Sequence, residues 1–350
     1  MAEPGTAGPA PGMEASLRLH ALAYSLGVTA AVTAAARLSL ADVLDEEPQP
    51  VGVLAAAVGA DREALGQLLR ALACHGVFRE TEEGTYAHTE LSRLLRTDAP
   101  AGRRAMALLA GAPFAWQIWS RLDDAVRTGR SVFPDVYGTT LFQHLHEEEP
   151  ELGMLFDRAM AKSGEATSAA VAAALDLTGT ATLADIGGGR GTLLKALLEQ
   201  HPGMGGVLFD LEKVVAAADP SLREDGALGD RCRLVAGDCH VDVPVKADTY
   251  LLKGVVHMWN DDTAVAVLRT IARNAPAEAR VIMIEQVLDA TRNPEIATVM
   301  NLLMLVSQGG RERTGGEFRA LCERAGLEFR HITGTGSAVH LVEAVVPGRR

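Results

Sequence analysis

An acidic residue followed by evenly spaced glycines marks one place where this chain of 350 residues could do chemistry. Asp185, Gly187, Gly189 and Gly191 form the pattern D-x-G-x-G-x-G between a short apolar run and a stretch of helical periodicity. Such glycines let a ligand approach the main chain beside the free N–H groups of a helix N-terminus. A dinucleotide site expects G-x-G-x-x-G, and Thr192 occupies the third glycine position. The spacing favours S-adenosylmethionine, which has an ammonium group and no pyrophosphate, over a dinucleotide or a turn that binds nothing.

Two further acids end predicted strands where the same ligand could be bound. Asp210 ends VLFD, and its carboxylate could bind both ribose hydroxyls or instead cap the next helix. Asp238, in GDC, could meet an adenine edge or serve as a turn residue. Cys239 would be a soft apolar contact and not a reactive thiol, because Asp238 beside it disfavours the thiolate. The predicted cofactor site also includes Leu211 and Lys253.

A histidine with two candidate carboxylate partners could act as a general base. His257 follows the apolar run TYLLKGVV, while Glu285 ends another predicted strand and Glu312 lies in GGRERT. A histidine needs an orienting carboxylate for this role, and the rate should rise with pH through its pKa, which is near 6.5 when unperturbed. Alternatively, His257 is a core residue, and the two glutamates form surface salt bridges with Arg311 or Arg313.

These residues follow strands that alternate with helices, which predicts a parallel sheet with helices on both faces. The predicted strands are residues 182–187, 206–211, 233–238, 249–254 and 280–288, with helices at 191–200 and 262–275 and a closing strand pair at 327–335 and 338–346. Ligands of such α/β sheets bind at the carboxyl ends of the strands, where Asp185, Asp210, Asp238, Lys253 and Glu285 fall.

The N-terminal part differs in composition. Residues 1–13 are rich in Gly, Pro and Ala, which predicts disorder. Residues 16–37 are rich in Ala and Leu, so we expect a buried helix covered by a dimer partner. Three short helices, at 40–44, 51–58 and 61–75, and a hairpin at 77–88 give a winged-helix pattern. DNA binding is disfavoured, because these helices carry few cations and the hairpin is acidic.

Composition narrows the function classes. A formal net charge of −12 makes nucleic acid and anionic membranes poor partners. The four cysteines include no C-x-x-C pair, so neither zinc nor a disulfide framework is indicated, and no metal is predicted. The chain shows neither a secretory signal pattern nor an apolar run of about 18 residues, so we expect a cytoplasmic protein.

Seven of the 15 Phe, Trp and Tyr residues lie between positions 113 and 165, and this clustering indicates either a pocket wall or packing between domains. We therefore divide the chain into a tail (1–13), a dimerisation domain (14–110), a helical linker and acceptor-pocket wall (111–180) and a cofactor-binding domain (181–350).

The chain resembles S-adenosylmethionine-dependent O-methyltransferases that act on plant phenylpropanoids, hydroxyindoles and bacterial aromatic polyketides. The resemblance spans roughly residues 15–345, and its motifs are LADIGGGRGTLL, VLFDLEKVV, GDC, LLKGVVHMWND, VIMIEQVL, MNLLMLVSQGGRERT and EF-x-x-L-x-x-x-AGL. It implies a Rossmann-like class I methyltransferase domain and an all-helical, winged-helix-like dimerisation domain that forms a homodimer.

The resemblance also implies roles for individual residues. Asp210 would bind ribose, Asp238 and Cys239 would flank adenine, and Lys253 would lie by the cofactor. His257 would be the base for a phenolic hydroxyl of a small aromatic acceptor, beside Glu285 and Glu312. The residues expected to line the acceptor pocket are Phe142, Met160, Asn301 and Met304.

Three positions depart from the family pattern. His257-Met258-Trp259 replaces His-Asp-Trp, Cys239 is often Met or Phe, and Asn301 is often Asp. Met258 and Asn301 remove acids near the acceptor, which disfavours a cationic one. The alternatives are a family sibling with decarboxylase or hydroxylase chemistry and a winged-helix regulator that senses a ligand.

Overall fold

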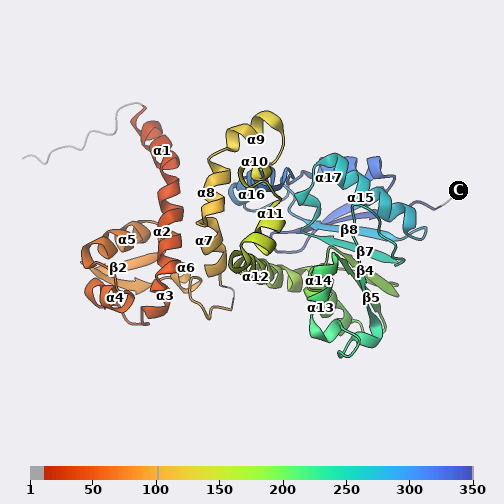
Figure 1. The fold of residues 1–350 in the computed structure, drawn as a ribbon, viewed down its shortest axis with the longest axis horizontal. Coiled ribbons are helices and arrows are strands. Elements are labelled where there is room, and N and C mark those ends of the chain that lie inside the picture. The colour runs from red at the N-terminus through yellow and green to blue at the C-terminus, as the bar shows by residue number, and fades with distance from the viewer. Residues whose placement is uncertain (1–11, 101, 349–350) are drawn as a thin grey trace, which may run out of the picture. The chain divides into compact units, whose positions relative to one another are not determined.

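The computed structural model describes residues 12–100 and 102–348, and the chain divides into two compact units (Figure 1). The first unit comprises Met1–Trp116 and Glu151–Lys162, and the second comprises Gln117–Pro150 and Ser163–Arg350. The predicted linker, residues 111–180, is thus shared between the units. The disorder predicted for residues 1–13 falls mainly on residues 1–11, which lie outside the described residues.

The first unit is mainly helical. Its helices are α1 (Met13–Ala23), α2 (Ser25–Arg37), α3 (Leu40–Val43), α4 (Val51–Val58), α5 (Arg62–Cys74), α6 (Glu90–Arg93) and α7 (Arg104–Ala110), together with the start of α8 (Pro113–Trp119) and residues 151–162 of α12 (Pro150–Ala174). A small antiparallel sheet has the order β1-β3-β2, from Gln49–Pro50, Thr85–His88 and Phe78–Glu82 respectively. The predicted hairpin is confirmed as β2 and β3. The expectation of an all-helical domain was too narrow, because this hairpin pairs with β1.

Helix α5 shows how the sequence sets this unit. Asp61 is its N-cap, and the Asp61 side chain accepts the Ala64 N–H at 2.8 Å. Leu65, Leu69 and Leu72 follow at spacings of four and three residues and are buried. One face of the helix therefore packs into the core of the unit.

Helix α1 leaves its apolar side chains uncovered. None of its residues is buried, and Leu17, Leu19 and Leu22 are 62%, 69% and 63% exposed. The sequence predicts that this segment is buried, and a single chain does not bury it. Among the described residues, no single helix is long and apolar enough to cross a membrane. The pair α1 and α2 meets that test by length and composition only, with a 43° bend between the helices.

The second unit contains a seven-stranded sheet in the order β6-β5-β4-β7-β8-β10-β9 (Figure 1). The strands are β4 (Thr182–Ile186), β5 (Gly205–Asp210), β6 (Cys232–Ala236), β7 (Thr249–Lys253), β8 (Arg280–Glu285), β9 (Glu328–Gly334) and β10 (His340–Val345). The first five are parallel, and β10 pairs antiparallel with both β8 and β9. The predicted parallel sheet with a closing antiparallel pair is confirmed.

Helices cover both faces of this sheet. The helices of the unit after α8 are α9 (Leu122–Thr128), α10 (Phe133–Tyr137), α11 (Leu141–Gln143), the second part of α12 (Pro150–Ala174), α13 (Thr192–Gln200), α14 (Glu212–Ala216), α15 (Asp261–Asn274), α16 (Pro294–Gln308) and α17 (Gly315–Ala325). Alternate strand residues face opposite sides, so Leu183 and Leu208 pack with α13, while Ala184 and Val207 lie in the cluster that includes α15 and α17. The strands are therefore apolar on both faces and polar mainly at their carboxyl ends.

Candidate active site

The glycine turn joins β4 to α13 at the carboxyl edge of the sheet. Gly187 and Gly189 have φ values of +68° and +62°, in the left-handed region. A Cβ on Gly187 would lie 2.8 Å from Val255 Cγ1, so packing within the chain already requires this glycine. Apart from Gly189 and its two chain neighbours, no described residue has an atom within 4 Å of the place a Cβ on Gly189 would take. Gly189 is therefore where the main chain borders space that a ligand can enter.

Asp185 is buried beneath this turn. It is 1% exposed, and its Oδ1 has no hydrogen-bond partner among the described residues. Burial raises the pKa of Asp185 to about 7, although nearby Lys253 opposes the shift. Burial likewise lowers the pKa of Lys253, opposed by Asp185 and Glu285. A positive charge bound at the turn would stabilise the Asp185 carboxylate, because charges interact strongly in the low dielectric of this buried site.

Asp210 connects the end of β5 to the glycine turn. Its Oδ2 accepts the Gly189 N–H at 2.8 Å, and its Oδ1 accepts the Leu211 N–H at 2.7 Å. Leu211 itself is the N-cap of α14 and is 54% exposed. Burial raises the pKa of Asp210, and the two backbone N–H groups oppose this. Each carboxylate oxygen retains a lone pair that a ribose hydroxyl can use.

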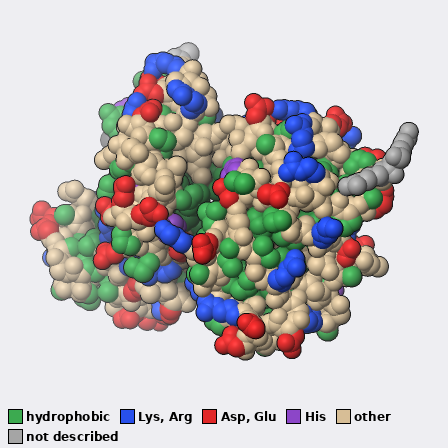
Figure 2. Space-filling view, turned by 45° about the vertical axis from the view of Figure 1, so that its right-hand side comes forward, with side chains coloured by type: hydrophobic (Ala, Val, Ile, Leu, Met, Phe, Trp, Pro, Cys, Tyr) green, Lys and Arg blue, Asp and Glu red, His purple; other side chains and the backbone are tan. Residues whose placement is uncertain are grey.

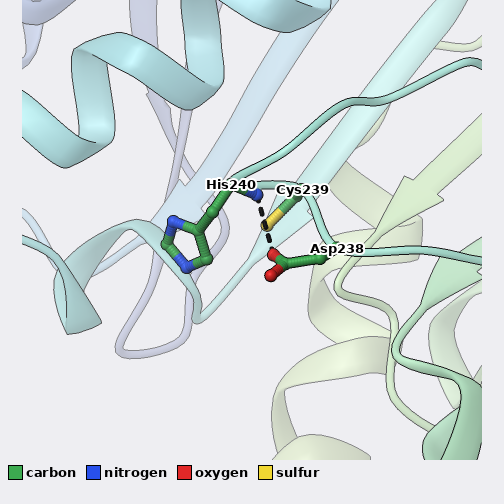
Figure 3. A group of neighbouring side chains, drawn as sticks. All are labelled: Asp238, Cys239 and His240. Atoms are coloured by element: carbon green, nitrogen blue, oxygen red, sulfur yellow. Dashed lines mark hydrogen bonds between the residues drawn. The ribbon is translucent and has the colours of Figure 1, made fainter.

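The Asp238–Cys239 pair lies in a turn after β6 (Figure 3). Asp238 Oδ1 accepts the His240 N–H at 2.9 Å, so the turn role considered for Asp238 is observed. Burial raises the pKa of the Cys239 thiol to about 12, assisted by Asp238, which agrees with an unreactive thiol. The His240 ring lies 5.1 Å from the Trp259 ring, edge to face. This contact joins the predicted adenine side to the segment that carries His257.

His257 lies in a short 3₁₀ turn, Val256–Met258 (η4), just after β7. Its Nδ1 is 2.8 Å from Glu312 Oε1 and 3.9 Å from Glu285 Oε2. The His257 side chain is 26% exposed, whereas those of Glu285 and Glu312 are 1% and 3% exposed. Burial alone would lower the pKa of His257, but the two glutamates raise it to about 9. The pKa of His257 is therefore perturbed well above the value of 6.5 for a free histidine, because two buried carboxylates favour the imidazolium.

Glu285 holds the main chain of this turn. Its Oε1 accepts the N–H groups of Val255 and Val256 at 3.0 and 2.7 Å. Burial raises the pKa of Glu285, opposed first by His257. Because both glutamates are buried, the alternative of surface salt bridges is wrong for Glu285 and Glu312.

Glu312 is held from the opposite side by α16. Its main-chain N–H donates to Asn301 Oδ1 at 2.9 Å. The preceding residue, Arg311, donates its main-chain N–H to the His257 carbonyl at 2.8 Å. Asn301, predicted only as an acceptor contact, thus also fixes the loop that carries Glu312.

The other predicted acceptor residues are spread over several helices. Met304 lies one helical turn after Asn301 on α16, a helix that contacts η4. Phe142 lies on α11 and is 37% exposed. Met160 lies on α12 in the first unit and is 40% exposed. The structure therefore brings Asn301 to the His257 cluster, and the pocket roles of the others stay predictions.

The sequence does not identify Arg313 and Asp261 as residues of this cluster. Arg313 is fully buried and bonds Asp261 and the main chain on both sides of His257. From the sequence, Arg313 is only a candidate surface partner of Glu285 or Glu312. A signal was present, because an arginine directly follows Glu312 and an acid lies four residues after His257. Only the tertiary structure shows that they meet.

Two groups of three residues among the described ones offer ligand atoms within 4.8 Å of one another. One is Asp238, Cys239 and His240, whose thiol has a raised pKa and is protonated at neutral pH. The other is His257, Glu285 and Glu312, where the Nδ1 that could ligate a metal is already paired with Glu312. Both groups are therefore better suited to hydrogen bonding than to metal ligation.

The parallel sheet, the glycine turn and the acid at the end of β5 define a class I S-adenosylmethionine-dependent methyltransferase. Residues 119–328 match the O-methyltransferase domain family, and residues 21–98 match the O-methyltransferase dimerisation domain. The first match covers more than half of the chain, so the protein belongs to the O-methyltransferase family. Its cofactor is S-adenosyl-L-methionine, and the first unit contains a dimerisation domain.

Individual relatives cover most of the chain. The mitomycin biosynthesis 6-O-methyltransferase of Streptomyces lavendulae is 38% identical over 89% of this chain and 89% of the relative. The phenazine-1-carboxylate N-methyltransferase of Pseudomonas aeruginosa is 30% identical over 86% of this chain and 88% of the relative. A solved O-methyltransferase from neocarzinostatin biosynthesis, in complex with S-adenosylmethionine and 2-hydroxy-5-methyl naphthoic acid, is 33% identical. It covers 91% of this chain and 96% of its own, with a TM-score of 0.77.

Proposed function

We propose that the chain methylates a phenolic hydroxyl of a small aromatic secondary metabolite, with His257 as the general base. The observation that carries this proposal is the 2.8 Å contact between His257 Nδ1 and the buried Glu312. That contact fixes the ring, so Nε2 is the nitrogen that would take the acceptor proton. The solved relative with a bound hydroxynaphthoic acid supports an aromatic acceptor.

The residues at the carboxyl edge suit S-adenosylmethionine. Gly189 would admit the ligand to the main chain, Asp210 would bind the ribose, and Asp238 and Cys239 would contact the adenine. Asp185 and Lys253 would act through charge from below the turn. When bound, the cofactor supplies a methyl group on a sulfonium. The task left to the chain is therefore to activate and position the acceptor.

The two glutamates bring the pKa of His257 closer to that of a phenol. A phenol has a pKa of about 10, so an imidazole with the reference pKa of about 6.5 would be roughly 3.5 units too weak a base. A His257 pKa of about 9 reduces that mismatch to about one unit, or ~1.4 kcal/mol. The opposing effect is that only about 1% of His257 is neutral at pH 7. The rate should therefore rise with pH up to about 9.

Apart from Glu285 and Glu312, which face His257, two possible acids near the acceptor are absent, because Met258 and Asn301 stand where the family pattern often has Asp. Phe142 and Met304, both in the second unit, would add apolar contacts around the ring. This composition suits a neutral aromatic acceptor better than a cationic one.

An acceptor panel with methyl-labelled S-adenosylmethionine tests the reaction class. Matched pairs such as 2-naphthol and 2-naphthylamine separate O-methylation from N-methylation by mass and fragmentation of the product. We expect label on oxygen. Label confined to nitrogen would favour the second candidate, N-methyl transfer, which the Pseudomonas relative supports. Acceptor conversion without label would favour decarboxylase or hydroxylase chemistry.

We also infer a homodimer formed through the first unit. The match of residues 21–98 to a dimerisation domain and the exposed apolar side chains of α1 support it. Light scattering at micromolar concentration should give twice the chain mass of 36.9 kDa. Leu22→Glu should shift the protein toward monomer or aggregate, whereas Val126→Glu, at an equally exposed position of α9, should not. A monodisperse wild-type monomer would contradict the dimer.

A further inference from the structure

Arg313 is the largest fully buried side chain among the described residues, and all three of its guanidinium nitrogens are bonded. Nε donates to Asp261 Oδ1 at 2.9 Å. One terminal nitrogen donates to the carbonyls of Val256 and Arg311, at 3.0 and 3.2 Å. The other donates to the Trp259 carbonyl at 2.7 Å. A buried cation is costly unless it is paired and fully hydrogen-bonded, and here it is both.

The bonded carbonyls are those next to the proposed base and its partner. Val256 and Trp259 enclose His257 in the sequence, and Arg311 directly precedes Glu312. One planar group thus connects two segments that lie 55 residues apart. Asp261, the first residue of α15, holds the guanidinium in place from a third direction.

The main chain of Arg313 connects to the third member of the cluster. The Arg313 carbonyl accepts the Leu288 N–H at 2.9 Å, and Arg313 forms a parallel bridge with Val287. These two residues follow shortly after Glu285 at the end of β8. Arg313 therefore contacts the segments that carry His257, Glu285 and Glu312. Among the described residues, its side chain makes no direct hydrogen bond to the imidazole of His257 or to the carboxylates of the two glutamates.

We propose that Arg313 is a positioning residue that sets the separation of His257 and Glu312 by fixing the main chain around both. The inference rests on the proposed role of His257 as the base. Arginine suits this position because its rigid fork offers five N–H donors, whereas lysine offers donors from one nitrogen only. Lysine would keep the positive charge and lose most of the bonds to the carbonyls of Val256, Trp259 and Arg311. This difference separates an effect of charge from an effect of position.

The test compares Arg313→Met and Arg313→Lys with Arg324→Met as a matched control. Arg324 pairs with Asp262 at the same end of α15, but it does not bond the His257 segment. We expect kcat per folded molecule to fall ~10–100-fold in both Arg313 variants, since a misplacement of about 1 Å can cost ~10²-fold. KM for the acceptor and the affinity for S-adenosylmethionine should change less than about threefold, by the same reasoning. Arg324→Met should keep the wild-type rate.

The second readout is the titration of His257, followed by NMR of the full chain with labelled histidine and assigned with His257→Gln. We expect the His257 pKa to fall toward its reference value in both Arg313 variants, because the pairing with Glu312 loosens. Normal kcat and an unchanged titration in folded Arg313→Lys would overturn the proposal, because charge alone would then suffice. If Arg313→Met does not fold, Arg313→Lys still decides. Loss of the base role itself would be seen separately, as normal turnover in His257→Gln.

Discussion

The two ends of the candidate site are built differently. The proposed cofactor end uses the main chain: Gly187 and Gly189 in left-handed conformations and the Asp210 carboxylate bonded to two N–H groups. The proposed acceptor end uses side chains: His257 paired with two buried glutamates from other segments. At the first end most polar partners are near in sequence, and at the second they come from 30 to 55 residues away.

This difference in construction predicts different sensitivities. A site formed by the main chain is altered by substitutions that change φ or fill space, and such substitutions should change the affinity for the ligand. A site formed by paired buried charges is altered by changes of protonation or position, and such changes should alter the catalytic rate. We therefore expect substitutions at the two ends to separate binding from catalysis.

The largest effect should come from His257→Gln. We expect kcat to fall ~10²–10⁴-fold, because no group then takes the phenol proton, while S-adenosylmethionine affinity stays within about threefold. In the wild type the rate should rise with pH up to about 9, and this dependence should vanish in the variant. Steady-state kinetics between pH 6 and 10 and calorimetric binding measure both. His331→Gln, at an exposed histidine of β9, is the matched control.

Stability gives an independent check on the charge state of His257. Its folded pKa of about 9 lies above the unfolded value of about 6.5. Protonated His257 therefore stabilises the fold fully below pH ~6.5, and this contribution is lost as the pH rises through about 9. The difference in melting temperature between wild type and His257→Gln should shrink over that interval. A difference that is constant with pH would remove the interpretation of a raised pKa.

The next effect concerns the cofactor end. Asp210→Asn should weaken S-adenosylmethionine binding ~10–100-fold, because charge-assisted hydrogen bonds contribute about 1.5–3 kcal/mol each. At saturating cofactor its kcat should recover to near the wild-type value, unlike that of His257→Gln. Asp238→Asn is the companion variant, and we expect a smaller loss because its carboxylate also serves the turn. Calorimetry showing unchanged affinity in both variants would contradict the predicted cofactor contacts.

The same contrast explains what could be predicted from sequence. The glycine turn and the strand periodicity are local patterns, so the strands around Asp185 and Asp210 were predicted to within a few residues. His257, Glu285 and Glu312 could be proposed as partners from their types and strand positions. The raised pKa of His257 and the role of Arg313 could not, because both depend on burial and on carbonyl positions that only the tertiary structure sets.

The smallest effect should come from Asn301→Asp, which restores the acid common in the family at this position. Aspartate keeps an oxygen to accept the Glu312 N–H, so the loop that carries Glu312 should stay in place. The added negative charge near Glu312 should favour the imidazolium and move the pH dependence of kcat to higher pH. At its optimum the rate should stay within about threefold of wild type, since the geometry is kept. Asn301→Ala is the matched variant that removes the oxygen without adding charge, and it should lower kcat with no upward shift in pH. An identical pH profile in Asn301→Asp and wild type would show that the acceptor end tolerates a charge at this position. The sensitivity of the catalytic rate to charge would then be limited to the direct partners of His257.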